Sequence, residues 1–131
     1  MALSREGALR AARLRRRCFA QDQTAYADLR AAPSALTGGA APATSSALSL
    51  PANARLGISF SAPVGAGQLS VDTETGRTLG TPALVADEIY RLDWLERTVD
   101  VTITSAIAGT ATLYVFDQWM RSYPIATVVF T

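Results

Sequence analysis

From Leu48 onward, apolar residues recur at every second position, and this period of two constrains the fold more than any other feature. In residues 99–104, three aliphatic side chains alternate with Asp and Thr, as in a strand with one buried face. The same alternation predicts strands in 56–60, 68–72, 110–117 and 125–131, with a less regular strand in 90–95. Because no segment of helix length separates these strands, a parallel α/β fold is excluded. Short strands divided by Gly and Pro predict a mainly β fold, either a compact antiparallel β-sandwich or a small barrel.

Composition divides the chain into three segments. Residues 33–47 contain no charged side chain and almost no large one, and they include Gly38-Gly39, which is typical of a flexible linker. Residues 1–32, ahead of this linker, are predicted to form a basic helical arm. Residues 48–131, behind it, hold the strands. We therefore predict one β domain that an Ala/Pro/Gly/Ser-rich linker joins to an α-helical N-terminal arm.

The predicted arm carries most of the positive charge. All 12 basic residues are arginines, and the first 35 residues have a net charge of +4, whereas the chain from residue 55 onward has a net charge of −3. Five arginines fall on one side of the predicted helix and are expected to anchor the arm: Arg5, Arg10, Arg13, Arg16 and Arg17. The anchor can be a partner protein, nucleic-acid phosphates or an anionic membrane surface. The sequence leaves these three open.

Missing residue types exclude several kinds of chemistry. Cys18 is the only cysteine and there is no histidine, so no intrachain disulfide or cysteine-based zinc site can form. Histidine-dependent hydrolase mechanisms are excluded for the same reason. We therefore expect no catalytic residue, no metal and no cofactor, and thus a protein that is not an enzyme. No apolar stretch reaches the length of a membrane span, and no apolar core follows the basic N-terminus, so we expect no signal peptide.

The acidic residues between 87 and 100 are a weaker candidate site. They lack the spacing of a calcium loop, and Arg91 and Arg97 lie among them. The mixture of signs predicts a solvated or interface surface with salt bridges.

Two segments near the C-terminus carry large apolar side chains on both faces of a predicted strand. Such a strand lies either in the middle of a sandwich or at a subunit interface. Since so small a domain has little material to cover both faces, we predict a sheet interface formed by Tyr114, Phe116, Trp119, Val128 and Phe130. The alternative is a carbohydrate-binding surface that uses Tyr114, Trp119 and Tyr123.

The chain resembles small structural proteins of tailed bacteriophage virions, such as capsid decoration and head-tail or tail accessory proteins. The resemblance lies in the Thr-, Ala- and Gly-rich strands of 98–117, the Gly-Gly/Pro segment 37–42 and the arm ahead of a β domain. It extends over the whole chain but includes no diagnostic motif, so no functional residue is carried over.

The resemblance implies a non-enzymatic structural or assembly protein of a virus particle. Such a protein would be a homo-oligomer with protein partners, located in the virion, or otherwise in the bacterial cytoplasm. Two alternatives stay open at this stage. One is a carbohydrate- or receptor-binding β-sandwich, and the other is a nucleic-acid-phosphate binder that acts through the arginine arm.

Overall fold

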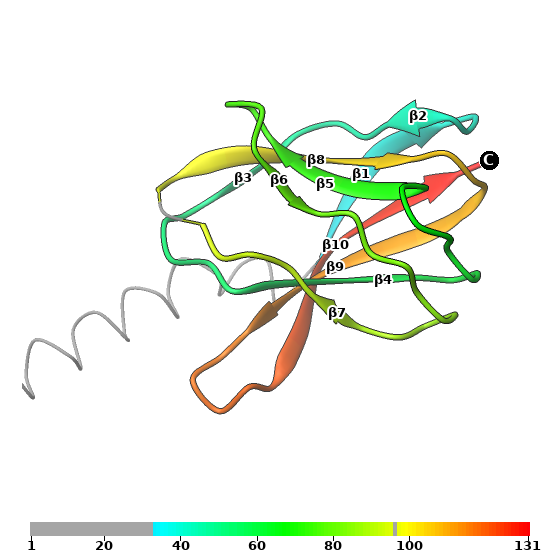
Figure 1. The fold of residues 1–131 in the computed structure, drawn as a ribbon. Helices are drawn as coiled ribbons and strands as arrows, with labels where there is room; N and C mark the ends of the chain where they lie inside the picture. Colours follow the sequence, from blue (N-terminus) through cyan, green and yellow to red (C-terminus); the bar gives the residue numbers. More distant parts are fainter. Residues whose placement is uncertain (1–32, 96) are drawn as a thin grey trace, which may run out of the picture.

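The computed structural model describes residues 33–95 and 97–131, which form ten strands in two sheets (Figure 1). The first sheet consists, in order across it, of β1 (Ser34–Gly39), β10 (Ser122–Phe130), β9 (Gly109–Phe116), β4 (Leu56–Phe60) and β7 (Tyr90–Arg91). The second consists of β2 (Ala43–Thr44), β8 (Val99–Ser105), β5 (Leu69–Thr73) and β6 (Thr78–Gly80), with β3 (Leu48–Leu50) also paired to β8.

The mainly β prediction is confirmed, although the two sheets do not close into a barrel. Among the described strands, every pairing is antiparallel except that of β1 with β10, which is parallel. The prediction of a purely antiparallel fold therefore needs this correction. The predicted helical arm lies outside the described residues.

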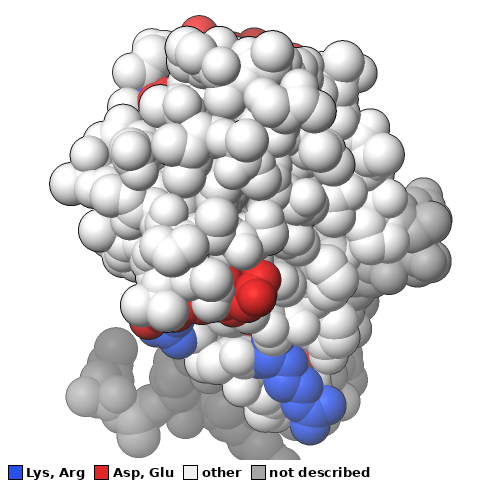
Figure 2. Space-filling view, turned by 90° about the vertical axis from the view of Figure 1, so that its right-hand side faces the viewer, with Lys and Arg blue, Asp and Glu red and all other residues white. Residues whose placement is uncertain are grey.

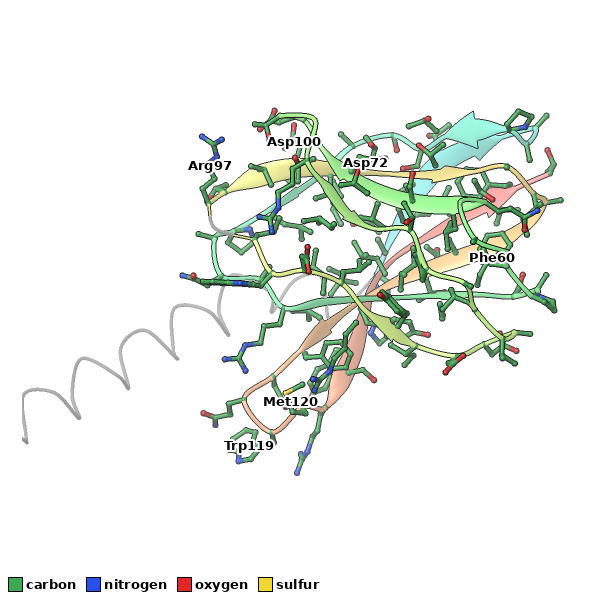
Figure 3. The ribbon with its side chains drawn as sticks, in the orientation of Figure 1. Phe60, Asp72, Arg97, Asp100, Trp119 and Met120 are labelled. Atoms are coloured by element: carbon green, nitrogen blue, oxygen red, sulfur yellow. The ribbon has the colours of Figure 1, made fainter. Side chains whose placement is uncertain are left out.

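The core lies between the two sheets, where the alternating side chains meet. β8 shows the predicted pattern in full, because Val99, Val101 and Ile103 are buried while the residues between them are half-buried. Phe60, at the end of β4, is completely buried and lies between the layers (Figure 3). The period of two therefore places one face of each long strand in a shared apolar core.

β9 and β10 form a long hairpin whose closed end extends past the two layers (Figure 1). The pairing of β9 with β4 stops at Val115, opposite Leu56, whereas the pairing of β9 with β10 continues to Phe116 and Ser122. The turn of this hairpin thus projects from the body and leaves its side chains accessible.

The prediction of a flexible linker in 33–47 is wrong. β1 lies within this segment and runs alongside β10, with Leu36 opposite Val128. The small residues have a steric role there: a side chain on Gly38 would collide with the backbone carbonyl of Val129. An uncharged run of small residues was interpreted as flexible, but here it permits one strand to approach another closely.

Candidate functional site

The turn of the β9–β10 hairpin, residues 117–121, is held by the carboxylate of Asp117. Asp117 Oδ1 accepts hydrogen bonds from the backbone N–H groups of Trp119 and Arg121, both at 2.9 Å. Its Oδ2 accepts one from the hydroxyl of Tyr123, at 3.1 Å. The backbone N–H of Met120 also donates to the carbonyl of Asp117, at 3.0 Å. This set of bonds fixes the turn in one conformation.

The same contacts set the ionisation of Asp117, whose residue is only 9% exposed. Burial opposes the charged form, but the backbone hydrogen bonds from Arg121 and Trp119, the Tyr123 hydroxyl and the charge of Arg121 outweigh it. The pKa of Asp117 is therefore lowered from the usual value of 3.8. The carboxylate is charged at neutral pH and holds the turn in that form.

We expect Asp117→Asn to remove part of the acid sensitivity of the domain. The folded-state pKa lies below the unfolded value, so this carboxylate contributes stability that is present above pH 3.8 and is lost as the pH falls through the folded-state pKa. Urea unfolding between pH 7 and pH 2 measures the effect. The variant should be less stable at pH 7 and should show a smaller loss of stability on acidification. An unchanged pH profile would contradict this role of Asp117.

Two large apolar side chains stand exposed on this turn. Trp119 is 64% exposed and Met120 is 40% exposed, and Figure 3 shows both at the end of the hairpin, away from the core. Met120 also has a left-handed backbone, with φ of 64°. That conformation suits glycine and costs a side-chain-bearing residue about 1–2 kcal/mol. A large, exposed side chain is thus kept at a position where glycine would fit better.

Beside the turn, the first sheet carries a groove of about 280 Å³. Eight residues line it: Arg55, Leu56, Arg91, Leu92, Asp93, Trp94, Phe116 and Met120. Trp94 is 55% exposed. The groove and the hairpin turn share Met120, so they form one continuous surface, which we call the hairpin–groove site and define as the eight lining residues together with Trp119 and Arg121.

The aromatic floor of the groove depends on Gly57. A Cβ atom at this position would lie 2.7 Å from Cε2 of Phe116, so the ring of Phe116 rests directly on the backbone of β4. The guanidinium of Arg91 lies over that ring, 5.5 Å from its centroid. At the turn, the guanidinium of Arg121 similarly lies 5.7 Å from the ring centroid of Trp119. Both arginines are positioned by aromatic rings.

Few charged side chains lie on the side of the domain that is at the right in Figure 1. Figure 2 shows this side as mostly uncharged, with acidic atoms at its upper rim and charged side chains of both signs in its lower part. The closed end of the hairpin is at the same lower level in Figure 1.

The structure brings together only some of the residues predicted for a sheet interface. Phe116 and Trp119 belong to the hairpin–groove site, and Tyr114 accepts a hydrogen bond from Ser59 on the outer face of the first sheet. Val128 and Phe130, in contrast, are buried in the core. Their side chains point between the sheets, so they offer no surface to a partner.

The predicted anchoring arginines, Arg5 to Arg17, lie outside the described residues, and their role stays a prediction. Four residues of the hairpin–groove site were not predicted from the sequence: Arg55, Arg91, Trp94 and Met120. Only Trp94 carried a signal, since it is a large side chain in the irregular segment 90–95. The others are single residues that the pairing of β4 with β7 and the hairpin turn bring together.

The acidic stretch does not form a second site. Within residues 33–95 and 97–131, no three His, Cys, Asp or Glu side chains are grouped so that they could hold a metal ion. Asp93 forms an ion pair with Arg77 at 3.8 Å, and Asp72 on the second sheet accepts bonds from the hydroxyls of Ser70 and Thr78. Nor does the described part of the chain contain a helix with the length and hydrophobicity that a membrane span requires.

No protein-family model matches this chain, and no curated protein matches it. One similar solved structure is a conjugative transposon lipoprotein from Bacteroides eggerthii, with 16% identity over 73% of this chain and 90% of that chain and a TM-score of 0.39. Another is a lipoprotein from Bacteroides thetaiotaomicron, with 17% identity over 72% of each chain and a TM-score of 0.39. Similarity at this level assigns neither a family nor a function to the present chain.

These comparisons correct the expected resemblance to bacteriophage virion proteins. Both neighbours are described as lipoproteins from Bacteroides, neither is a virion protein, and no family model or curated protein supports a capsid or tail role. The predicted function in a virus particle and the predicted location in a virion or bacterial cytoplasm were therefore wrong. The resemblance rested on strands rich in Thr, Ala and Gly, and such a composition suits many small β domains.

Proposed function

We propose that the domain is a non-catalytic β-sandwich module that binds a protein partner through the hairpin–groove site. The observation that carries this proposal is the exposure of Trp119 and Met120 on a turn that Asp117 holds rigid. Aromatic side chains and Met are enriched in the binding surfaces of proteins, and a rigid presentation lowers the entropy that is lost on binding.

The backbone of Met120 supports the proposal independently. Strained residues in folded proteins concentrate at sites of function, because selection for folding alone removes them. A glycine at this position would relieve the left-handed strain but would remove the side chain that joins the turn to the groove. Met120 thus lowers the local stability of the turn but provides an exposed apolar side chain for contact with a partner.

The proposal is tested by selection from a ribosome-displayed library of random linear peptides, with the full chain of 131 residues as the target. Peptides that bind the wild-type chain should fail to bind a Trp94→Ala/Trp119→Ala double variant. Both substituted side chains are exposed, so the double variant should fold normally, and a far-UV circular dichroism spectrum checks this. A library that yields no peptide with this dependence, or binding confined to glycans, would overturn the proposal.

Met120→Gly should separate stability from binding. We expect the free energy of unfolding to stay the same or to rise by up to about 1 kcal/mol, because relief of left-handed strain exceeds the entropy that glycine adds to the unfolded chain. Affinity for a selected peptide should fall about 5-fold or more through loss of the side chain. Urea unfolding and fluorescence anisotropy measure the two quantities.

Met120→Ala is the matched control, since it removes the side chain but keeps the left-handed strain. It should weaken binding to a similar degree without the gain in stability. If Met120→Gly binds as tightly as the wild type, Met120 is not part of the binding surface.

A further inference from the structure

Among the described residues, the hairpin–groove site carries more cationic than anionic side chains. Within residues 33–95 and 97–131, the single ion pair closer than 4.0 Å joins Arg77 to Asp93, so Arg55, Arg91 and Arg121 have no acidic partner at that distance. Asp93 is the one acidic residue among those that line the groove, and its side chain is 68% exposed. The site is therefore positively charged although the chain beyond residue 55 is acidic overall.

Two of these arginines, Arg91 and Arg121, lie over aromatic rings. A guanidinium that rests on an aromatic ring keeps the N–H groups along its edge free to donate in its own plane. The Arg91 guanidinium lies 5.5 Å from the ring centroid of Phe116, and the Arg121 guanidinium lies 5.7 Å from that of Trp119, both within the range of cation–π contacts. A carboxylate fits the fork of a guanidinium with two parallel hydrogen bonds. The aromatic side chains thus place an apolar contact and a carboxylate-binding group side by side.

The volume of the groove limits its occupant. A volume of about 280 Å³ lies just below the range for small-molecule sites and suits one or two side chains of a peptide. Because Trp94, Phe116 and Met120 line the groove, it favours an occupant with at least one apolar side chain. A long polyanion fits less well, because it would extend beyond the groove onto the rest of the domain, where eight acidic residues outnumber five arginines from residue 55 onward.

We infer that the segment bound at this site is an acidic peptide of a partner protein. An apolar or aromatic side chain of that peptide occupies the groove, and neighbouring Asp or Glu carboxylates pair with Arg55 and Arg91. This inference rests on the proposed function and adds the chemistry of the partner to it. It assigns Arg55 and Arg91 as specificity-determining residues, which neither the sequence pattern nor the neighbouring structures indicated.

The test uses a peptide selected on the wild-type chain and a matched peptide in which each Asp is replaced by Asn and each Glu by Gln. We expect the selected peptides to be acidic and the neutral version to bind about 10-fold more weakly or worse. In an Arg55→Gln/Arg91→Gln double variant, the acidic and neutral peptides should bind equally. Arg97→Gln is the control, since Arg97 lies at the opposite end of the described domain from the hairpin turn (Figure 3) and should not affect the preference.

The outcomes separate this inference from the function on which it rests. Neutral peptides that need Trp94 and Trp119 but bind the Arg55→Gln/Arg91→Gln variant as tightly as the wild type would overturn the inference and leave the proposed function standing. Peptides that need neither tryptophan would overturn both. Displacement of bound peptide by a single-stranded oligonucleotide or by phosphatidylserine vesicles, with no preference between the acidic and neutral peptides, would assign the arginines to phosphate groups instead and overturn the inference.

Discussion

Replacing Phe60 with alanine is expected to lower the free energy of unfolding by about 3–5 kcal/mol. Phe60 is completely buried between the two sheets, and its ring also lies against Gly109, where a Cβ atom would come within 2.5 Å of ring carbon Cε1. Because Gly109 has a φ of 149°, its backbone is fixed in a conformation that suits glycine and cannot easily move to fill the cavity. The loss of stability therefore includes a large cavity contribution as well as lost burial.

Urea unfolding at neutral pH measures this loss, and two variants with smaller expected losses serve as comparisons. Ile58→Val, on the same face of β4, should cost about 0.5–1.5 kcal/mol, because it removes a single buried methylene. Val129→Ala, at a position that is 57% exposed on the first sheet, should change stability by about 0.5 kcal/mol or less. A domain of this size has a total stability of roughly 5–15 kcal/mol, so Phe60→Ala should remove a large fraction of it. A loss for Phe60→Ala no greater than that for Val129→Ala would show that the two sheets do not enclose Phe60 as described.

Replacing Trp119 with alanine is expected to weaken the binding of a selected peptide about 30-fold or more, which corresponds to about 2 kcal/mol. Trp119 offers the largest exposed apolar surface on the hairpin turn, and the turn beneath it is fixed by Asp117. Binding therefore gains the burial of an indole ring at little cost in entropy. Because Trp119 is exposed, the free energy of unfolding should change by about 0.5 kcal/mol or less.

Fluorescence anisotropy of a labelled peptide and urea unfolding of the same sample test the two parts of this prediction. Trp119→Phe is the matched variant, since it keeps an aromatic ring for contact with the peptide and with Arg121, and it should retain most of the affinity. A loss of affinity that merely follows a loss of stability would mean that Trp119 supports the fold and does not contact the partner.

The sequence predicted the parts of the fold that depend on the pattern within one strand. β8 was predicted correctly because its alternation reports a strand with one face in the core and one toward solvent. β1 was missed because its small residues give no such alternation, and its strand conformation depends on close contact with β10. The residue pattern of 34–39 alone does not predict this contact, because the contact depends equally on the residues of β10.

The candidate site was predictable only in part, for a related reason. Phe116 and Trp119 were identified by their size, but the same criterion selected Val128 and Phe130, whose side chains fill the core. The size of an apolar side chain does not by itself predict whether that side chain faces the core or the surface. Arg55 lines the groove together with residues that are distant from it in the sequence. The pairing of β4 with β7 brings these two segments of the chain together. Such clusters become visible only with the fold.

The claim that the hairpin–groove site binds the partner is tested most directly by mapping a selected peptide onto the full chain by NMR. Titration of the peptide into the ¹⁵N-labelled protein should shift the backbone amide signals of residues 91–94 and 116–121, and the side-chain signals of Trp94 and Trp119. The amides of β5 and β8, on the second sheet, should not change. Shifts concentrated on β5 and β8, with the signals of the hairpin turn unchanged, would contradict this account.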